Sequence, residues 1–156
     1  MPEFPSTIET EHLFDADIEL EASEDLKQAP MGRRLIIIVK DGTVEGPRLR
    51  GRLRPGGGDW ALVQANGALE LDVRATIETH DAALIYLYYR GVLDAPPDVM
   101  RRALSGEDVS PSEYYFRTTP RFETGFEQYA WLNKQVCVGV GWFGPGRVGY
   151  RVFGVK

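Results

Sequence analysis

The chain has 156 residues, a formal net charge of −5 at pH 7, 17 glycines and a single cysteine. This length suits one domain that buries about two thirds of its unfolded surface and needs no disulfide or metal for stability. The acidic balance argues against nucleic acid or a membrane as a partner, and no apolar run reaches the roughly 18 residues that cross a bilayer. Cys137 has no internal partner and the N-terminal residues hold no apolar signal segment, so we expect a soluble, cytoplasmic protein.

The N-terminal part predicts an arm followed by strands. Residues 1–11 contain two prolines and scattered polar groups, which indicates a flexible arm. Residues 12–23 (HLFDADIELEAS) alternate apolar and acidic side chains, and this period of two predicts a strand with an acidic outer face. Residues 23–32 predict a polar loop, and the β-branched run at 35–39 predicts a buried strand.

A stripe of arginines follows within residues 46–58 (GPRLRGRLRPGGG). Arg48, Arg50, Arg52 and Arg54 fall on one side of a strand, where they form either an anion-binding stripe or a solvated face paired with acidic residues of the first strand. The acidic first strand offers ready counter-charges, so we favour the solvated face and expect no nucleic-acid partner.

The middle of the chain, residues 58–91, predicts three antiparallel strands in a row. Asn66-Gly67 is typical of a tight hairpin turn. Residues 68–78 alternate strictly between apolar and polar side chains, as a strand does. The run AALIYLYY at residues 82–89 is apolar on both sides, so we expect it to be covered on both sides or to lie in the middle of a closed sheet.

One short helix is predicted after Gly91, from Pro96-Pro97 to a stop at Gly106. Further strands are predicted at residues 113–120, 130–142 and 148–155, with a shorter one near 121–124. The expected fold class is therefore all-β and mainly antiparallel: a closed or nearly closed β-barrel of about eight to ten strands over residues 12–156, since closure removes the exposed edges of so many aromatic strands.

Charged and aromatic residues on these strands are the candidate site. Asp72 and Arg74 share one face of a strand, about 6.5 to 7 Å apart. If they point into the barrel, burial requires them to pair or to meet a polar ligand. Asp72 would then serve as a base, Arg74 and Arg117 as anion clamps, and Tyr89 or Tyr115 as proton donors. The remaining candidate substrate-binding residues are Trp60, Glu123, Trp131 and Asn133.

The alternative interpretation remains open. By periodicity, the even-numbered side of residues 70–78 is the wet face, where Asp72 and Arg74 form a surface pair worth under about 1 kcal/mol. The tyrosine run is better explained as core or as a dimer interface than as a binding platform.

Several familiar chemistries are not expected. His12 and His80 are isolated histidines without acidic or cysteine partners at ligand spacing, so we predict no metal site. The chain has no G-x-S-x-G motif, no dinucleotide fingerprint and no phosphate loop, and we expect no cofactor. Cys137 lies mid-strand among valines and glycines, which favours an inert buried thiol.

Four separated motifs occur in the order of a known family: GGGDW (56–60), LDVRATIET (71–79), YYFRTTPRFET (114–124) and YAWLN (129–133). In these the chain resembles the bacterial and fungal family called domain of unknown function 3237. The resemblance implies a single-domain, calycin-like barrel that is often a homodimer, and it implies no reaction. The chain departs from the family pattern at Asp81-Ala82, where the family has Asp-Gly.

Two functions of different class follow as hypotheses. The first is a cofactor-free enzyme that moves protons on a small oxygenated or carboxylated metabolite, as an isomerase, cyclase, dehydratase or lyase does. The second is a barrel that binds a small molecule without turning it over, or a structural dimerisation module.

Overall fold

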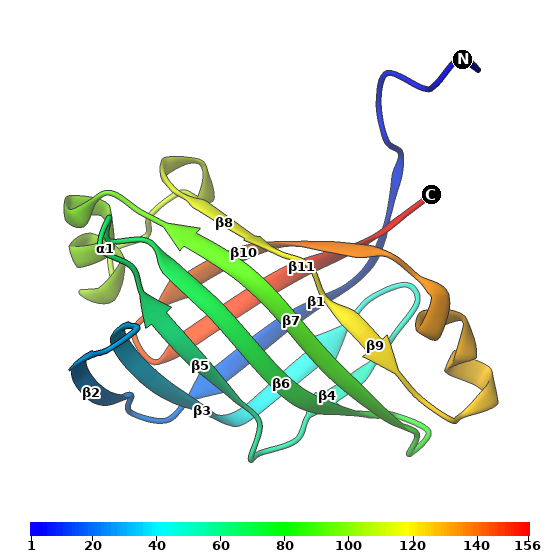
Figure 1. Ribbon diagram of the computed structural model, residues 1–156. Coiled ribbons are helices and arrows are strands. Elements are labelled where there is room, and N and C mark those ends of the chain that lie inside the picture. The colour runs from blue at the N-terminus through cyan, green and yellow to red at the C-terminus, as the bar shows by residue number, and fades with distance from the viewer.

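The computed structural model describes all 156 residues and shows a closed barrel of eight antiparallel strands (Figure 1). The barrel order is β1 (Thr10–Leu20), β11 (Arg147–Val155), β10 (Cys137–Gly144), β8 (Tyr115–Thr118), β7 (Leu84–Asp94), β6 (Leu69–Thr79), β5 (Gly58–Val63), β3 (Gly32–Glu45) and back to β1. Pairing between β6 and β7 closes the ring. Three further strands pair with it: β2 (Glu24–Ala29), β4 (Gly51–Leu53) and β9 (Arg121–Glu123). The predicted all-β barrel is confirmed.

The helical segments are short. The predicted helix is present as α1 (Pro97–Leu104), with proline in its first turn. Two 3₁₀ segments accompany it, η1 (Pro111–Glu113) and η2 (Glu127–Lys134). The strand predicted to begin at residue 130 is wrong in its first part, because Tyr129 and Leu132 bury one face at the i, i+3 spacing of a 3₁₀ turn. None of these helices has the length and apolar character needed to span a bilayer.

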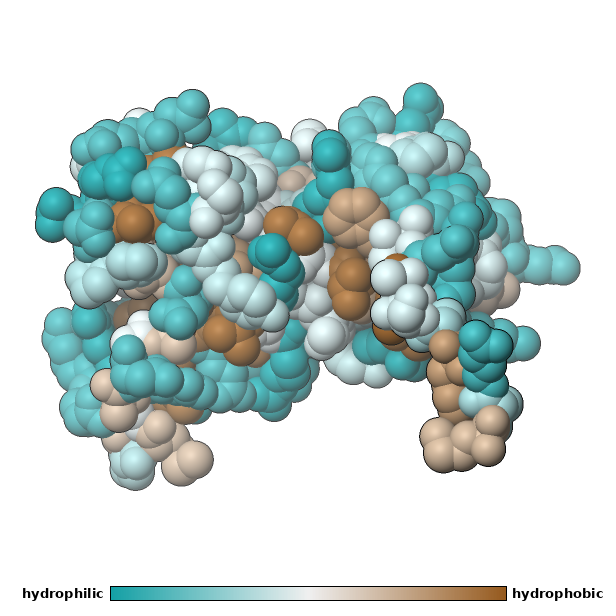
Figure 2. All heavy atoms as spheres, turned by 90° about the horizontal axis from the view of Figure 1, so that it is seen from above, coloured by the Kyte–Doolittle hydropathy of each residue, from teal (hydrophilic) through white to brown (hydrophobic).

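Side-chain alternation on β6 and β7 defines the inside of the barrel. The odd-numbered residues are buried, as in the fully buried pair Ile77 and Ile85. The outward side chains of β7 remain open, with Tyr86 38% and Tyr88 41% exposed. The run at 82–89 is thus covered on one side only, and its second apolar side lies on the outer wall. Much of the face seen from above in Figure 2 is hydrophilic, with hydrophobic groups scattered among the polar ones.

The arginine stripe is solvated, and three of its four arginines form ion pairs. Arg52 Nη2 lies 3.2 Å and Arg54 Nε 3.7 Å from Glu78 Oε2, and Arg48 Nη1 lies 3.0 Å from Glu11 Oε1. The favoured solvated face is present, although Glu78 on β6 supplies more of the counter-charge than the first strand does.

The predicted loop at 23–32 is partly wrong, because β2 occupies most of it and pairs with β3.

The interior of the barrel has two unlike halves. One half is packed with hydrocarbon, and only a residual void of about 20 Å³ remains among its side chains, which include Phe14, Leu53, Ile77, Phe122 and Val152. The other half holds a cavity of about 570 Å³. The cavity opens at the end of the barrel where β2 and α1 lie, on the left of Figure 1.

Candidate functional site

The cavity has predominantly apolar walls. Inward side chains of five barrel strands supply them, namely Leu35, Ile37, Val39, Leu71, Val73, Phe116, Phe143 and Val148. Met100 and Leu104 of α1 border it at the open end. A hollow of this size and lining lies within the usual range of small-molecule sites.

Two buried tyrosines separate the cavity from the packed half of the barrel. Tyr89 on β7 and Tyr150 on β11 line both the cavity and the residual void beyond it, as Ile18 and Leu53 also do, so these four side chains form the floor of the cavity. The ring centroids of the two tyrosines lie 5.4 Å apart with the rings 68° from parallel, an edge-to-face contact. Each ring carries a hydroxyl group, and each hydroxyl influences the pKa of the other. The floor therefore carries two polar groups in an otherwise hydrocarbon interior.

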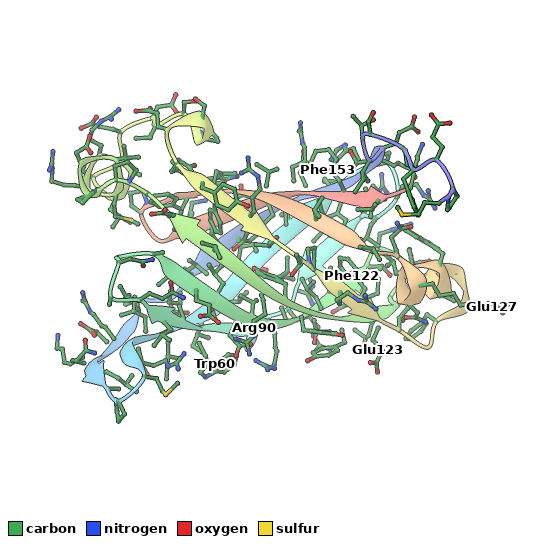
Figure 3. All side chains as sticks on the ribbon, turned by 45° about the horizontal axis from the view of Figure 1, so that its top comes forward. Trp60, Arg90, Phe122, Glu123, Glu127 and Phe153 are labelled. Atoms are coloured by element: carbon green, nitrogen blue, oxygen red, sulfur yellow. The ribbon has the colours of Figure 1, made fainter.

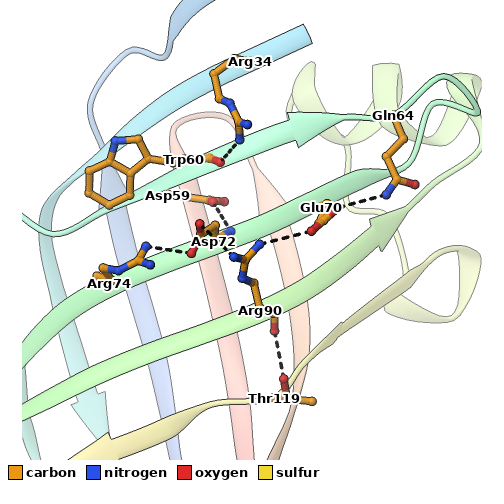
Figure 4. A network of polar contacts seen from close by, with 9 residues as sticks. All are labelled: Arg34, Asp59, Trp60, Gln64, Glu70, Asp72, Arg74, Arg90 and Thr119. Carbon is orange, nitrogen blue, oxygen red and sulfur yellow. Dashed lines mark hydrogen bonds and ion pairs between the residues drawn. The ribbon is translucent and has the colours of Figure 1, made fainter. Parts of the chain in front are cut away.

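Asp59 adds a carboxyl group to this floor. It is an inward residue of β5, on the same side as Ala61 and Val63, while Trp60 points outward. Its Oδ1 accepts the backbone N–H of Asp72 at 2.9 Å (Figure 4). The ladder between β5 and β6 is interrupted at this point, between the pairs Asp59–Val73 and Leu62–Glu70. The Asp59 side chain thus accepts a backbone hydrogen bond from β6 at the point where the ladder between β5 and β6 is interrupted.

The surroundings of Asp59 shift its titration into the neutral range. The pKa of Asp59 is raised to about 6, chiefly by burial and in smaller part by the nearby Asp72 carboxylate, whereas the Asp72 N–H and the Arg34 guanidinium oppose the rise. Burial also raises the pKa of Tyr89 and of Tyr150, and the charge on Asp59 contributes to both increases. At neutral pH the floor accordingly combines an ionised carboxylate with two protonated hydroxyls.

Asp72 and Arg74 do not reach the cavity, and the hypothesis that they point inward is wrong. Both lie on the outer face of β6, where Arg74 Nη1 is 2.8 Å from Asp72 Oδ1 and Arg90 Nη2 is 3.4 Å from Asp72 Oδ2 (Figure 4). The reason is the strand period, since the inward positions beside them are taken by Leu71 and Val73. The alternative, a surface ion pair, describes them.

Tyr115 and Arg117 also lie on the outer wall. Tyr115 is 54% exposed, and the Arg117 guanidinium sits 5.1 Å from the centre of its ring. Phe116 between them takes the inward position. Trp60 on β5 and Glu123 on β9 are exposed on the outside as well (Figure 3). The structure does not bring these four predicted site residues to the cavity.

Trp131 and Asn133 belong to η2, which packs against β9 and contributes no lining to the cavity. The Arg48 guanidinium lies 4.3 Å from the centre of the Trp131 ring. Asn133 Oδ1 accepts the backbone N–H of Thr124 at 2.8 Å, and its Nδ2 donates to the Thr124 carbonyl at 2.9 Å. These contacts hold η2 to the barrel, so Trp131 and Asn133 have a structural role here.

Tyr89 is the one predicted site residue that lines the cavity, and Asp59 and Tyr150 are additional. Both missed residues carry a sequence signal. Asp59 is a single acid on the side of β5 that otherwise bears Ala61 and Val63, and Tyr150 alternates with the outward Arg151. An isolated polar residue at an inward position of a barrel strand is therefore the pattern that identifies them.

Other potential reactive groups are scattered. The structure contains no group of three or more histidine, cysteine, aspartate or glutamate side chains placed to hold a metal ion. Burial raises the pKa of Cys137 to about 11, so its thiol stays protonated at neutral pH.

Similar proteins share this barrel across almost its whole length. A UPF0311 protein of Rhodopseudomonas palustris is 34% identical over 133 residues, 85% of this chain and 87% of that protein. A crystal structure from that organism, titled as a conserved protein of unknown function, has a TM-score of 0.90 and 32% identity, covering 97% of this chain and all of the other. A β-barrel-like protein of Acinetobacter baumannii has a TM-score of 0.85 and 35% identity, covering 99% of this chain and all of the other.

A more distant structure shares the fold alone. It is titled as an enzyme from Penicillium herquei and has a TM-score of 0.71 at 19% identity, with both chains fully covered. The family model described as "Protein of unknown function (DUF3237)" matches residues 8–155. With nearly its whole length matched, the chain belongs to the DUF3237 family.

Proposed function

We propose that the protein binds a small oxygenated molecule in the barrel cavity and moves a proton on it without a cofactor. The observation that carries this proposal is the position of Asp59: a carboxyl group with a pKa of about 6 lines an apolar cavity beside two buried tyrosine hydroxyls. Pairs of groups whose surroundings move their pKa values apart are typical of acid–base sites.

Asp59 is the base in this proposal. At about pH 7 a carboxyl of this pKa is mostly ionised, yet it binds a proton more strongly than an ordinary aspartate does. It takes a proton from the carbon next to a substrate carbonyl. The C–H electron pair then forms a carbon–carbon double bond, and the carbonyl π electrons move to oxygen.

Tyr89 and Tyr150 stabilise the oxygen that gains charge. Both remain protonated because burial raises their pKa, so their O–H groups are donors. Fixed donors aimed at a developing oxyanion are among the largest contributions to catalysis of this kind. Return of the proton from Asp59 to a different atom of the substrate completes an isomerisation with no net change in oxidation state.

The distant similarity to an enzyme agrees with this proposal at the level of the fold, since the structure from Penicillium herquei with the same barrel is titled as an enzyme.

Binding without turnover is the second candidate function. The observation that favours it is the cavity wall, where hydrocarbon side chains far outnumber polar ones.

The Asp59→Asn variant separates the two functions, and Glu123→Gln on the outer wall is its matched control. Exchange of the acidic α-hydrogens of an enolisable ketone into D₂O, followed by NMR, measures the proton transfer. We expect Asp59→Asn to lose about 100-fold or more of the exchange rate while the ketone still binds. An unchanged exchange rate in Asp59→Asn, or an equal loss in Glu123→Gln, would contradict the assignment of the base.

A further inference from the structure

The charged side chains around the cavity are distributed unevenly. Its ionisable lining residues are Glu21, Arg33, Asp59, Tyr89, Arg147 and Tyr150. Both arginines are already paired outside it: Arg33 contacts Asp25 through Nε at 3.2 Å and Nη2 at 2.8 Å, and Arg147 Nη2 contacts Asp17 Oδ2. Their side chains are also more than half exposed. The cavity therefore offers an incoming anion no unpaired cation.

The charge inside the cavity is negative when Asp59 is ionised. A carboxylate ligand that reached the floor would place a second negative charge beside Asp59 in an apolar space, where like charges repel strongly. Beyond the two neutral tyrosine hydroxyls, the wall beside it adds no donor to compensate, because Leu71, Val73 and Phe116 are hydrocarbon. A neutral ligand avoids this repulsion.

Aromatic rings form a continuous wall from the open end to the floor. Phe143 contacts Phe116 edge-on at 6.4 Å between centroids, Phe116 contacts Tyr150 at 5.4 Å, and Tyr150 contacts Tyr89 at 5.4 Å. All four line the cavity. Aromatic walls of this kind favour flat ring systems, whose faces and edges match the ring quadrupoles.

We infer that the cavity takes a neutral, ring-containing ketone or phenol, held along the Phe143–Phe116–Tyr150–Tyr89 wall with its oxygen at the tyrosine hydroxyls, in preference to a carboxylate. This inference rests on the proposed function for its orientation, because the oxygen that accepts from the tyrosines is the one next to the reacting carbon. It narrows the substrate class that the sequence left open between oxygenated and carboxylated molecules.

Three probes with the same two-ring skeleton test the inference on the full chain. They are 2-tetralone, a neutral ketone; 1,2,3,4-tetrahydro-2-naphthoate, a carboxylate; and 2-aminotetralin, an ammonium ion. Isothermal titration calorimetry at about pH 7.5 measures their dissociation constants. We expect the ketone to bind about tenfold or more tightly than either charged probe. Equal or tighter binding of the carboxylate would overturn the inference, as would tightest binding of the ammonium ion, which would make Asp59 a counter-ion.

A pair of variants checks the ring wall. Phe143→Leu removes a ring that lines the cavity, whereas Tyr115→Leu removes one from the outer wall. The ketone is expected to bind several-fold more weakly to the first variant and unchanged to the second. Equal effects of the two substitutions would count against the wall as the ring site.

Deuterium exchange of 2-tetralone, measured in parallel, keeps this inference separate from the proposed function. Selective ketone binding without enzyme-dependent exchange supports the substrate class and contradicts proton transfer. Exchange accompanied by equal affinity for all three probes supports proton transfer and contradicts the substrate class. Failure of all three to bind overturns the substrate class.

Discussion

The Asp59 carboxylate accepts the backbone N–H of Asp72 at 2.9 Å, across the interruption of the β5–β6 ladder. On the same side of the interruption, the Trp60 carbonyl accepts a hydrogen bond from Arg34 Nη1 at 2.6 Å. Two backbone groups are thus satisfied by side chains, which opens the wall where Asp59 meets the cavity. The interrupted ladder thus fixes the position of the acid, while its burial raises the pKa.

Stability should depend on pH through Asp59. Its pKa in the folded protein, about 6, lies above the ordinary value of about 3.9, so the folded state holds the proton more tightly than the unfolded state does. The resulting stabilisation is complete below about pH 4 and is lost as the pH rises through about 6. We expect Asp59→Asn, which cannot ionise, to gain on the order of 2 kcal/mol over the native chain between these limits.

Urea unfolding of both proteins at about pH 4 and about pH 7.5 measures this change. Asp25 and Asp81 have lowered pKa values, so their contributions are lost as the pH falls, but they are common to both proteins and cancel in the difference. A difference that stays constant with pH would show that the Asp59 carboxyl is not shifted.

The rate of proton transfer should follow the ionisation of the same carboxyl. If Asp59 is the base, kcat/KM rises with pH up to about 6 and then forms a plateau, because only the carboxylate accepts a proton. The plateau extends well into the alkaline range, since the pKa of Tyr89 and that of Tyr150 are both raised. A pH–rate profile of the free enzyme checks both limits, and a rate that is still rising above about pH 8 would point to a different base.

The hydroxyl groups of the floor are expected to act on the rate more than on binding. Tyr89→Phe and Tyr150→Phe each remove one donor to the developing oxyanion while keeping the ring, so we expect kcat to fall by about 100-fold with little change in KM. Tyr88→Phe, on the outward side of β7, is the control and should leave both constants unchanged. Steady-state kinetics with the ketone decides between these outcomes.

The Asn133 side chain should affect the free energy of unfolding and leave the affinity for the ligand unchanged. Asn133→Ala removes its two hydrogen bonds to the backbone of Thr124 and is expected to cost about 1 to 3 kcal/mol of unfolding free energy. The cavity lining contains no residue of η2, so the dissociation constant of the ketone should not change. Unfolding and calorimetry on the same preparation compare the two effects, and a weakened affinity would restore the earlier assignment of Asn133 to substrate binding.

The regular strands and α1 were predictable because their signals are local. The alternation of β1 and β6 and the proline pair before α1 are visible within about ten residues of sequence. The 3₁₀ segment η2 was not, since a single i, i+3 pair such as Tyr129 and Leu132 is compatible with several local structures.

The site was harder to predict than the fold. The period of two already predicts that Asp72 lies on the solvent-facing side of its strand. Its position inside a family motif favoured a role in the site, and the structure does not support that role. Asp59 lies in the neighbouring motif on the six-residue strand β5, and its partner Tyr150 comes from the last strand of the chain. Only closure of the barrel brings these residues together, and a local pattern does not contain that information.

The corner between β6 and β7 offers a test of backbone strain. Ala82 has a φ of 65°, in the left-handed region that favours glycine. Its neighbour Asp81 holds the corner, because its Oδ1 accepts from Thr79 Oγ1 at 2.5 Å and from the Tyr129 hydroxyl at 2.8 Å. The side chains therefore keep Ala82 in a conformation that costs an alanine about 1 to 2 kcal/mol.

Ala82→Gly is expected to relieve this cost and to raise the unfolding free energy by about 1 kcal/mol, after the greater entropy of glycine in the unfolded chain is subtracted. Ala65→Gly in the β5–β6 turn is the control, because Ala65 has no positive φ and should lose a few tenths of a kcal/mol or more. Urea unfolding of the two variants measures the contrast. If Ala82→Gly and Ala65→Gly lost the same unfolding free energy, Ala82 would carry no backbone strain that glycine relieves.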